Sequence, residues 1–260
     1  MKVVITLIVT CLLSLSFLGC KINNISVPEA KSTNTYVVVV GLETSKFAGS
    51  CPGAGYDADR MYKLLAQFSP NIVLLRDSNA TKANVASALS RAVENAKEGL
   101  VIFSYSGHGG SEPFKDTGME EADGSDEFLC LYDTYMRDNE IWDIISKSNG
   151  RIFMIYDCCH SQTLYRNVGF KVRPPLSWDY RLNEQKSFSM LCWSGCPDNT
   201  YSYGASNGGQ FTNALLRHFG EHKTYEGLWN EIKNDRTLRS YENPQSTVLG
   251  KGFDGKKIFR

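Results

Sequence analysis

Two apolar stretches of this sequence each end in side chains that can do chemistry. Residues 100–107 lead to His108, and residues 151–156 lead to an aspartate, two adjacent cysteines and a histidine. A cysteine attacks as its thiolate, and a histidine within hydrogen-bond reach can form that thiolate by accepting the proton. If the two stretches are neighbouring parallel strands, their carboxyl ends meet at one edge of the sheet. The pattern therefore indicates a thiol nucleophile with a histidine base.

The two glycines around the first histidine suit the same chemistry. Gly107 and Gly109 have no side chains, so a substrate carbonyl can approach the backbone there. The Gly109 amide can donate a hydrogen bond to the oxyanion that forms when a thiolate attacks a carbonyl. Because these glycines open the space around it, His108 is favoured as the base over His160.

The segments that must position these groups alternate between strand and helix patterns. Apolar runs predict strands at 35–42, 71–77, 99–109, 150–160 and 187–196, and a short one at 256–260. Amphipathic spacing predicts helices at 57–68, 138–148, 209–219 and 224–234, and at 81–97 with Thr81 as the N-cap. Strands that are apolar on both faces, with helices between them, indicate a parallel sheet buried on both sides. The predicted fold class is therefore α/β, a three-layer αβα sandwich with a mostly parallel central sheet.

The composition excludes one class of partner. The chain of 260 residues is 42% hydrophobic, and its 28 basic residues balance its 28 acidic ones. It can therefore bury a sizeable core, and it has no electrostatic footprint for nucleic acid. Residues 161–187 show no clear period and carry two adjacent prolines and several basic residues. We expect a long, mobile loop there.

The N-terminus predicts export. Residues 1–19 combine a lysine with an apolar stretch that is short for a membrane span, which is typical of a signal peptide. The stretch resembles a bacterial lipoprotein signal, in which Cys20 becomes the lipidated first residue. Residues 20–34 would then tether the domain at 35–260 to a membrane, on the periplasmic side or at the cell surface. An ordinary secretory signal cut nearby is the alternative.

An exported chain can form disulfides. The cysteines that remain after the signal are Cys51, Cys130, Cys158, Cys159, Cys192 and Cys196. An even number permits pairing but does not establish it. Adjacent Cys158 and Cys159 are poor partners, because neighbouring residues of a strand point to opposite faces.

Several sequence blocks resemble the caspase-like clan of cysteine peptidases, and its metacaspase branch in particular. The family's histidine block is YSGHG at 105–109, and its Asp-x-Cys-His-Ser-Gly block is DCCHSQ at 157–162. The resemblance extends over roughly residues 36–260. Its other blocks are YDADRM, ADGSDEFLCLYD, CPDNTYSYG, GGQFTNALL and NPQSTVLG.

The resemblance implies a caspase-like fold and assigns the dyad. His108 would be the base, and Cys159, directly before a histidine, would be the nucleophile. Cys158 would fill a variable position, and the amides of Gly109 and Cys159 would hold the oxyanion. Gln162 stands where the family has glycine, which leaves the turn after the nucleophile in question.

The residues that match the metacaspase substrate pocket are Asp57, Ser106 and Asp157. Caspases proper have glutamine at the position of Asp157, with basic residues that receive an aspartate. Two carboxylates in one pocket are costly unless a cation enters, so we expect Arg or Lys at the cleavage position. For Asp57 the alternative is an acid that simply interacts with a helix N-terminus.

No cofactor is expected for the chemistry, but the metacaspase resemblance raises Ca²⁺ as an activator. Asp123 and Asp138 match positions of that kind. Asn139 replaces a further acid, and Arg166 lies where another acid would be expected. An acidic run is otherwise most often a solvated loop.

Two other patterns compete weakly. Gly53, Gly55 and Ala58 fit G-x-G-x-x-A, but a dinucleotide site needs its glycine turn directly after a strand, and here a loop intervenes. His218 and His222 have i,i+4 spacing but lack the H-E-x-x-H motif. Cys192 and Cys196 have no second pair, so a zinc site is also weakly supported.

The sequence therefore predicts an exported, lipid-anchored cysteine endopeptidase that cuts after Arg or Lys, with a protein or peptide as its substrate. The basic residues of 161–187 suggest that this loop is itself cleaved. The alternative is an exported, catalytically silent protein of caspase fold that binds a partner, and Gln162 is the feature that favours it.

Overall fold

The computed structural model describes residues 31–46, 48–113, 125–159, 161, 164, 179–182, 186–196, 204–221 and 223–260. They belong to one compact unit, Lys31–Arg260. The predicted signal peptide, Cys20 and the tether up to residue 30 lie outside the described residues, as does most of the predicted loop at 161–187. In the described part of the chain, no helix is both long and apolar enough to cross a membrane.

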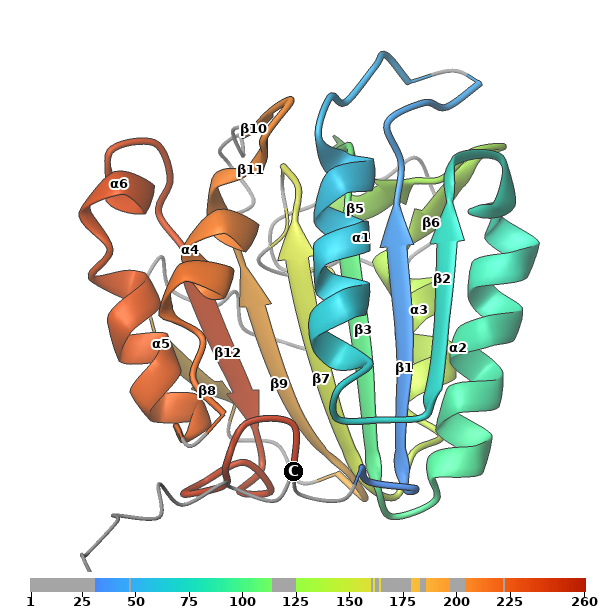
Figure 1. Ribbon diagram of the computed structural model, residues 1–260. Coiled ribbons are helices and arrows are strands. Elements are labelled where there is room, and N and C mark those ends of the chain that lie inside the picture. Colours follow the sequence, from blue (N-terminus) through green and yellow to red (C-terminus); the bar gives the residue numbers. More distant parts are fainter. Residues whose placement is uncertain are drawn as a thin grey trace, which may run out of the picture. The chain divides into compact units, whose positions relative to one another are not determined.

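A seven-stranded sheet forms the middle layer of this unit (Figure 1). Its order is β2-β1-β3-β7-β9-β12-β8, and every neighbouring pair is parallel except β9 with β12. The strands are β1 (Thr35–Gly41), β2 (Asn71–Arg76), β3 (Leu100–Ser106), β7 (Arg151–Asp157), β8 (Asp179–Leu182), β9 (Ser189–Ser194) and β12 (Gln245–Leu249). The mostly parallel sheet predicted from the sequence is confirmed.

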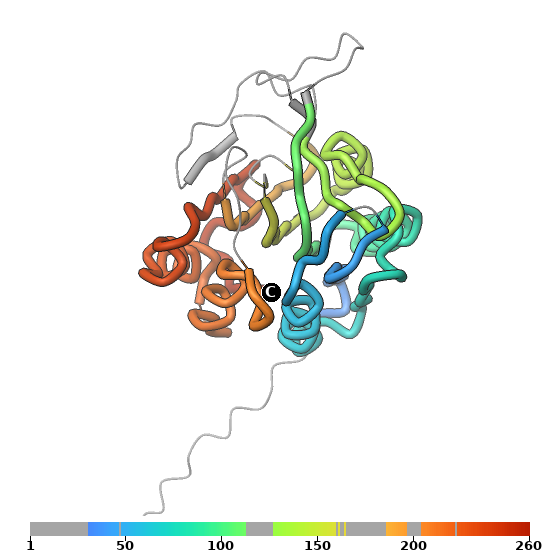
Figure 2. Tube along the Cα trace, turned by 90° about the horizontal axis from the view of Figure 1, so that it is seen from above, coloured from blue at the N-terminus to red at the C-terminus, as the bar shows by residue number. Residues whose placement is uncertain are grey.

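Helices cover both faces of this sheet (Figures 1 and 2). They are α1 (Ala54–Leu65), α2 (Lys82–Ala96), α3 (Asp138–Ile145), α4 (Gln210–His218), α5 (Tyr225–Lys233) and the short α6 (Arg236–Arg239). Helices α1, α4 and α5 bury apolar residues in one cluster, and α2 and α3 bury theirs in another. The three-layer αβα arrangement is thus as predicted.

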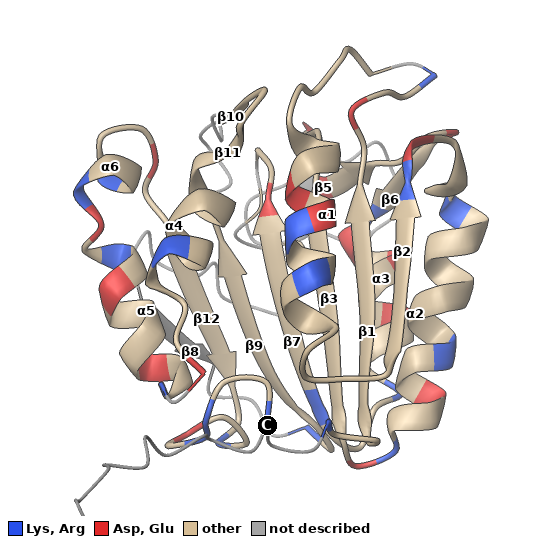
Figure 3. Ribbon diagram, viewed as in Figure 1, with Lys and Arg blue, Asp and Glu red and all other residues tan. Residues whose placement is uncertain are grey.

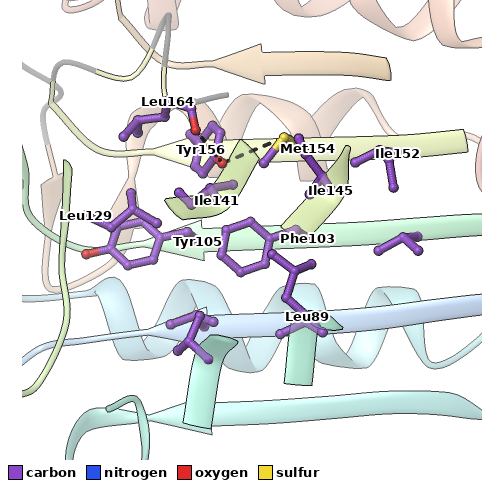
Figure 4. Close-up of a cluster of buried hydrophobic side chains, with 14 of the residues drawn as sticks. Leu89, Phe103, Tyr105, Leu129, Ile141, Ile145, Ile152, Met154, Tyr156 and Leu164 are labelled. Carbon is purple, nitrogen blue, oxygen red and sulfur yellow. Dashed lines mark hydrogen bonds between the residues drawn. The ribbon is translucent and has the colours of Figure 1, made fainter. Parts of the chain in front are cut away.

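Side chains of β1 show why the sheet separates two cores. Val38 and Val40 pack into the cluster under α2 and α3, whereas Val37 and Val39 pack into the one under α1, α4 and α5. Successive side chains of a strand point to opposite faces, so a strand buried on both sides is apolar at every position. Figure 4 shows the first cluster around Phe103. Charged side chains lie mainly on the helices and at the strand ends (Figure 3).

Two smaller sheets and the helix caps complete the fold. Strands β4 (Gly109–Pro113), β5 (Ser125–Cys130) and β6 (Tyr135–Arg137) form an antiparallel sheet that begins just after β3. Strands β10 (Gly204–Ala205) and β11 (Gly208–Gly209) form a hairpin that leads into α4. The hydroxyl of Thr81 accepts a hydrogen bond from the Asn84 amide at 3.3 Å, which confirms this residue as the N-cap of α2.

The end of the chain differs from the prediction. Residues 256–260 form no strand of the central sheet, and Lys257 makes only an isolated bridge to Thr224. Ile258 and Phe259 are fully buried, which explains their apolar pattern. Phe259 has a φ of 57°, a left-handed conformation that an extended strand does not contain. The last strand of the sheet is β12.

Part of the predicted loop is also a strand. Strand β8 lies inside 161–187 and pairs in parallel with β12, so that Asp179 stands opposite Ser246. A strand of four residues is too short to show a hydrophobic period, which is why the sequence pattern missed it.

Candidate active site

Strands β3 and β7 bring the two reactive motifs to one edge. They are parallel neighbours in a register that places Ser106 opposite Asp157. The amide of Gly107 donates to the Asp157 carbonyl oxygen at 3.3 Å and joins the two strand ends. The residues that follow both strands therefore emerge together at the carboxyl edge of the sheet, as expected for parallel neighbours.

A pocket of about 250 Å³ opens where these strands end. His108 and Cys159 both line it, and so do the three predicted substrate-binding residues, Asp57, Ser106 and Asp157. The segment that leads into α1 and both strands of the β10–β11 hairpin complete its wall. The structure thus gathers all five side chains around one space.

Hydrogen bonds from Tyr105 and Cys130 fix the main chain at His108. The hydroxyl of Tyr105 lies 2.7 Å from the His108 carbonyl oxygen and 2.9 Å from that of Cys130. The Cys130 amide also donates to the His108 carbonyl oxygen, at 3.0 Å. The imidazole Nε2 is 3.2 Å from the carbonyl oxygen of Ser50. When Nε2 carries the proton of that hydrogen bond, Nδ1 is the nitrogen that can accept another proton.

The two adjacent cysteines lie in different surroundings. Cys158 is 2% exposed and belongs to the core cluster under α2 and α3, and its burial raises its pKa well above the usual value for a thiol. Cys159 is half-buried, and although both cysteines belong to the lining of the pocket, it is the more accessible of the two. A thiol that stays protonated in the core is inert, so Cys158 is unsuited to be a nucleophile. Cys159, the nucleophile suggested by the motif, is the better candidate.

Gly109 can supply an amide to the same space. Strands β4 and β5 are antiparallel, and the hydrogen bond from the Cys130 amide to the His108 carbonyl oxygen makes these two residues a hydrogen-bonded pair. Such pairs alternate with non-hydrogen-bonded pairs along an antiparallel ladder. The next pair, Gly109 and Leu129, is therefore not hydrogen bonded, and the Gly109 amide points away from β5. A Cβ at Gly109 would lie 2.3 Å from the Cys159 carbonyl oxygen, and only glycine allows the two segments to approach so closely.

Asp57 is buried beneath the pocket wall. It lies in the first turn of α1, as the alternative interpretation required, but it is only 1% exposed. Its Oδ2 accepts hydrogen bonds from the Ser106 hydroxyl at 3.0 Å and from the Gly209 amide at 2.7 Å. Burial and the nearby Asp157 carboxylate raise the pKa of Asp57 to about 7. Its contacts therefore belong to the pocket.

A cation that the sequence analysis did not single out compensates this acid. The Nη2 atom of Arg60 is 2.5 Å from Asp57 Oδ1, and its guanidinium group lies over the ring of Tyr56, 4.4 Å from the centroid. Asp157 is 5% exposed and accepts a hydrogen bond from the Thr212 amide at 2.7 Å. The i,i+3 spacing of Arg60 on the helix was the signal that could have revealed it.

The β10–β11 hairpin closes against both carboxylates. A Cβ at Gly208 would lie 2.2 Å from Asp57 Oδ1, and one at Gly209 would lie 2.2 Å from Asp157 Oδ2. Gly208 also has a φ of 99°, which side chains disfavour. The paired glycines at the start of the GGQFTNALL block therefore serve the pocket.

Cys51 is a second thiol in the pocket wall, and sequence reasoning gave it no role. Its burial raises its pKa to about 12, and the carboxylate of Asp157 and the thiol of Cys159 add to this effect. The group therefore stays a neutral thiol at ordinary pH. Among the described residues, no disulfide joins any of the six cysteines.

The predicted calcium residues are only partly described. Asp138 opens α3, is fully buried, and its Oδ1 accepts a hydrogen bond from the Asn139 amide at 2.7 Å. Asp123 and Arg166 lie outside the described residues. Within the described residues, no group of three or more His, Cys, Asp or Glu side chains could hold a metal ion. Asp138 thus has the contacts of a helix-terminal acid, and calcium dependence stays a prediction.

The competing patterns have structural explanations. Gly53 precedes α1 with a φ of 93°, and residues 42–52 separate it from β1, so no glycine turn directly follows that strand. His218 lies 2.7 Å from the carboxylate of Asp235, while His222 lies outside the described residues. Cys192 is buried in β9, and the Cys196 thiol donates to the Cys158 carbonyl oxygen at 3.3 Å. His160 and Gln162 also lie outside the described residues.

Comparison with known proteins decides the family. The family profile of the caspase domain matches residues 35–246. The chain belongs to the caspase family of cysteine peptidases. Metacaspase-1A of Aspergillus oryzae is 26% identical, with 70% of this chain aligned to 62% of that protein. Metacaspase-1 of Ajellomyces capsulatus is 24% identical, with 80% of this chain aligned to 78% of that protein. The chain thus spans less than two thirds of the A. oryzae metacaspase.

Solved structures confirm the fold. Protein GSU0716 from Geobacter sulfurreducens matches with a TM-score of 0.67 at 23% identity, over 86% of this chain and 98% of that one. Caspase-1 from Spodoptera frugiperda matches with a TM-score of 0.52 at 15% identity, over 85% of this chain and 93% of that one. The α/β fold predicted from the sequence is therefore the caspase fold.

Proposed function

We propose that this caspase-family chain is an active cysteine endopeptidase that cuts peptide bonds after Arg or Lys. One observation carries the proposal. A histidine, a cysteine and two buried carboxylates, from segments far apart in the sequence, line a single pocket at the carboxyl edge of the sheet. Family membership supports a cysteine peptidase, and the acids support a basic side chain at the cleavage position.

The proposed reaction begins with proton transfer. His108, with Nε2 bound to the Ser50 carbonyl, accepts the Cys159 proton at Nδ1. The thiolate attacks the carbonyl carbon, and the Gly109 and Cys159 amides donate to the oxyanion. The tetrahedral intermediate collapses as His108 protonates the leaving amine, which leaves a thioester on Cys159. Water, deprotonated by His108, then hydrolyses the thioester and releases the acid product and the free thiol.

Charge supports a substrate with one positive side chain. Arg60 pairs with Asp57, and Asp157 is a second buried carboxylate in the same pocket. A substrate ammonium or guanidinium group would be attracted to these two acids. A substrate aspartate would instead add a like charge to a buried site, which would make the binding free energy less favourable by roughly several kcal/mol.

Three further expectations remain proposals. We propose that the chain is exported and anchored to a bacterial membrane through a lipid on Cys20. Calcium is proposed as an activator acting through Asp123 and Asp138, although the contacts of Asp138 do not by themselves support a site. Self-cleavage within 161–187 is proposed from its basic residues, and an active enzyme that runs as a single intact band would contradict it.

A panel of fluorogenic peptides ending in Arg, Lys, Asp or Ala tests the proposed function. The protein is the chain from residue 21, which retains the compact unit Lys31–Arg260. We expect turnover only after Arg and Lys, no turnover in Cys159→Ala, and full turnover in Cys192→Ala, a matched loss of a buried thiol in β9. Parallel assays with Ca²⁺ and with a chelator test the metal.

Each other outcome has a distinct meaning. Cleavage after Asp would keep the dyad but reject the acidic pocket. Absence of turnover with every peptide, also after limited proteolysis within 161–187, would reject the enzyme and favour a caspase-fold binding protein.

A further inference from the structure

A further pocket lies at the amino edge of the central sheet. Figure 1 shows that this edge is at the other end of the strands from the carboxyl edge. The pocket is an open cavity of about 590 Å³. Strand β7 begins there at Arg151 and β9 begins there at Ser189. Because β12 is antiparallel to β9, its carboxyl end brings residues 250–252 to the same place. The cavity is therefore separate from the catalytic residues.

Cations dominate the lining of this cavity. Among the described residues that line it, four are basic and Glu98 is the one acidic residue. The basic residues are Arg151, Lys186, Lys251 and Lys256. Lys251 and Lys256 are exposed, and neither they nor Arg151 form an ion pair with any described residue. In a chain with balanced total charge, this excess is local.

Arg151 supplies a second, independent observation. Its Nη1 atom is buried and has no hydrogen-bond partner among the described residues. Its guanidinium group also lies 5.8 Å from the ring centroid of Phe253, which limits its freedom to turn toward water. A buried donor without an acceptor is unfavourable, so Arg151 favours a ligand that brings an acceptor to it.

The turn beside Arg151 is fixed in place. Gly250 has a φ of 74°, and the Gly252 amide donates to the Ser189 hydroxyl oxygen at 3.0 Å. A Cβ at Gly252 would lie 3.1 Å from Arg151 Cγ, so the turn rests directly on the arginine side chain. The main chain at Lys251, inside this turn, is therefore fixed beside the Arg151 side chain, while the exposed lysine side chain extends into solvent.

We propose that this amino-edge cavity binds a phosphate group. A planar guanidinium donor together with several lysines is the combination that recognises the multiple oxygens of phosphate. Two sources share this chemistry, free phosphate and the headgroup of an anionic phospholipid.

The path of the chain favours the lipid source. The carbonyl oxygen of Asn34, one residue before β1, accepts the Leu100 amide at 3.1 Å. The next carbonyl back from Leu100, that of Gly99, accepts the Arg151 amide at 2.8 Å. The lipid source depends on the lipid anchor at Cys20 proposed above: the segment that follows this residue joins the domain at this edge, at Asn34. A headgroup bound there would leave the catalytic edge directed away from the membrane.

Two binding assays test the proposal without using peptidase activity. The chain from residue 21 is titrated with inorganic phosphate by calorimetry at constant ionic strength. It is also sedimented with phosphatidylcholine vesicles, with and without phosphatidylglycerol. The test variant is Lys251→Gln with Lys256→Gln, and the control removes two exposed charges from the helices, Lys63→Gln with Arg91→Gln.

We expect binding in at least one assay. The test variant should weaken that binding about tenfold or more, and the control should change it less than about twofold, because Lys251 and Lys256 line the cavity and Lys63 and Arg91 do not. Arg151→Lys, which keeps the charge but loses the planar donors, should weaken binding as well. Binding of phosphate alone identifies the free anion, and binding only to vesicles with phosphatidylglycerol identifies the headgroup. Absence of binding in both assays, or equal losses in test and control variants, would overturn the proposal.

Discussion

The two edges of the central sheet hold charge in opposite ways. At the carboxyl edge, Asp57 and Asp157 are 1% and 5% exposed, and each accepts a hydrogen bond from a main-chain amide. At the amino edge, Lys251 and Lys256 are exposed and form no ion pair with a described residue. A buried charge is costly unless fixed partners surround it, whereas an exposed lysine is solvated in many positions.

This difference separates two kinds of recognition. At the carboxyl edge, Asp57 has partners from α1, β3 and β11, and Asp157 has one from α4, so several elements of the fold set the positions of the two charges. One substitution there should have a large effect. At the amino edge the effect should grow with the number of cations removed, because screened surface charges act nearly independently.

The largest expected effect is at His108, the proposed base. His108→Ala should lower kcat/KM for an Arg peptide by about a thousandfold or more, because the thiol then has no group to accept its proton. His218→Ala is the matched control, since that imidazole pairs with Asp235 outside the pocket. Steady-state kinetics on both variants make the measurement. Comparable activity of the two variants would show that His108 is not the base.

The next effect concerns the buried acids. Asp57→Asn should lower kcat/KM for Arg peptides about 10- to 100-fold, because hydrogen bonds and ion pairs to a charged group are lost. It should also leave the Arg60 guanidinium without its carboxylate partner. Asp59→Asn is the control: this neighbour on α1 pairs with Arg76 at 2.8 Å, away from the pocket. If both variants lose selectivity for Arg equally, the buried position of Asp57 has no special part in recognition.

The raised pKa of Asp57 predicts a pH dependence of substrate binding. Below about pH 7 the carboxyl is largely protonated, so a cationic side chain must displace a proton to bind. Affinity for an Arg peptide should therefore rise about tenfold between pH 6 and 8 and then level off. Calorimetry on the Cys159→Ala variant removes the titration of the nucleophile from the measurement. The same rise in a Cys159→Ala, Asp57→Asn double variant would assign it to another group.

The sign of the linked stability change is opposite. The pKa of Asp57 rises from its ordinary 3.8 to about 7 on folding, so the folded state binds more protons between these values. The free energy of unfolding contributed by this group therefore falls as pH rises through this window and levels off above pH 7. A bound Arg side chain should offset that loss, because it favours the ionised carboxylate.

The sequence was sufficient to predict that the segments of His108 and Cys159 meet at one pocket, because both segments follow directly from strand patterns. His108 ends one apolar run and Cys159 follows another, and the parallel register alone brings such ends together. The same logic predicted the αβα layers from strands that are apolar on both faces. Local pattern was enough wherever the structure follows regular elements.

The rest depended on contacts that no local pattern contains. The hydrogen bond from the Gly209 amide to Asp57 joins residues 152 positions apart. The carbonyl oxygen of Ser50, which contacts His108, lies in a loop whose sequence has no hydrophobic period. The basic cavity likewise depends on topology. Because β12 is antiparallel to β9, residues 250–252 lie beside Arg151, where β7 begins. Such contacts follow from topology, which the sequence shows only coarsely.

The smallest expected effect tests whether side-chain contacts fix the main chain at His108, at the carboxyl edge of the sheet. Tyr105→Phe removes the hydroxyl that lies within hydrogen-bond distance of the His108 and Cys130 carbonyl oxygens. Tyr105 is only 1% exposed, so the loss of its buried hydroxyl should lower the free energy of unfolding by about 1–2 kcal/mol in urea titrations. It should also lower kcat a few-fold with little change in KM, since His108 shifts while the acids stay in place. Tyr62→Phe on α1 is the control, because its hydroxyl makes no hydrogen bond with a described residue. If the two variants unfold and turn over alike, the position of His108 depends on the Ser50 carbonyl and the β4–β5 ladder rather than on the tyrosine beneath it.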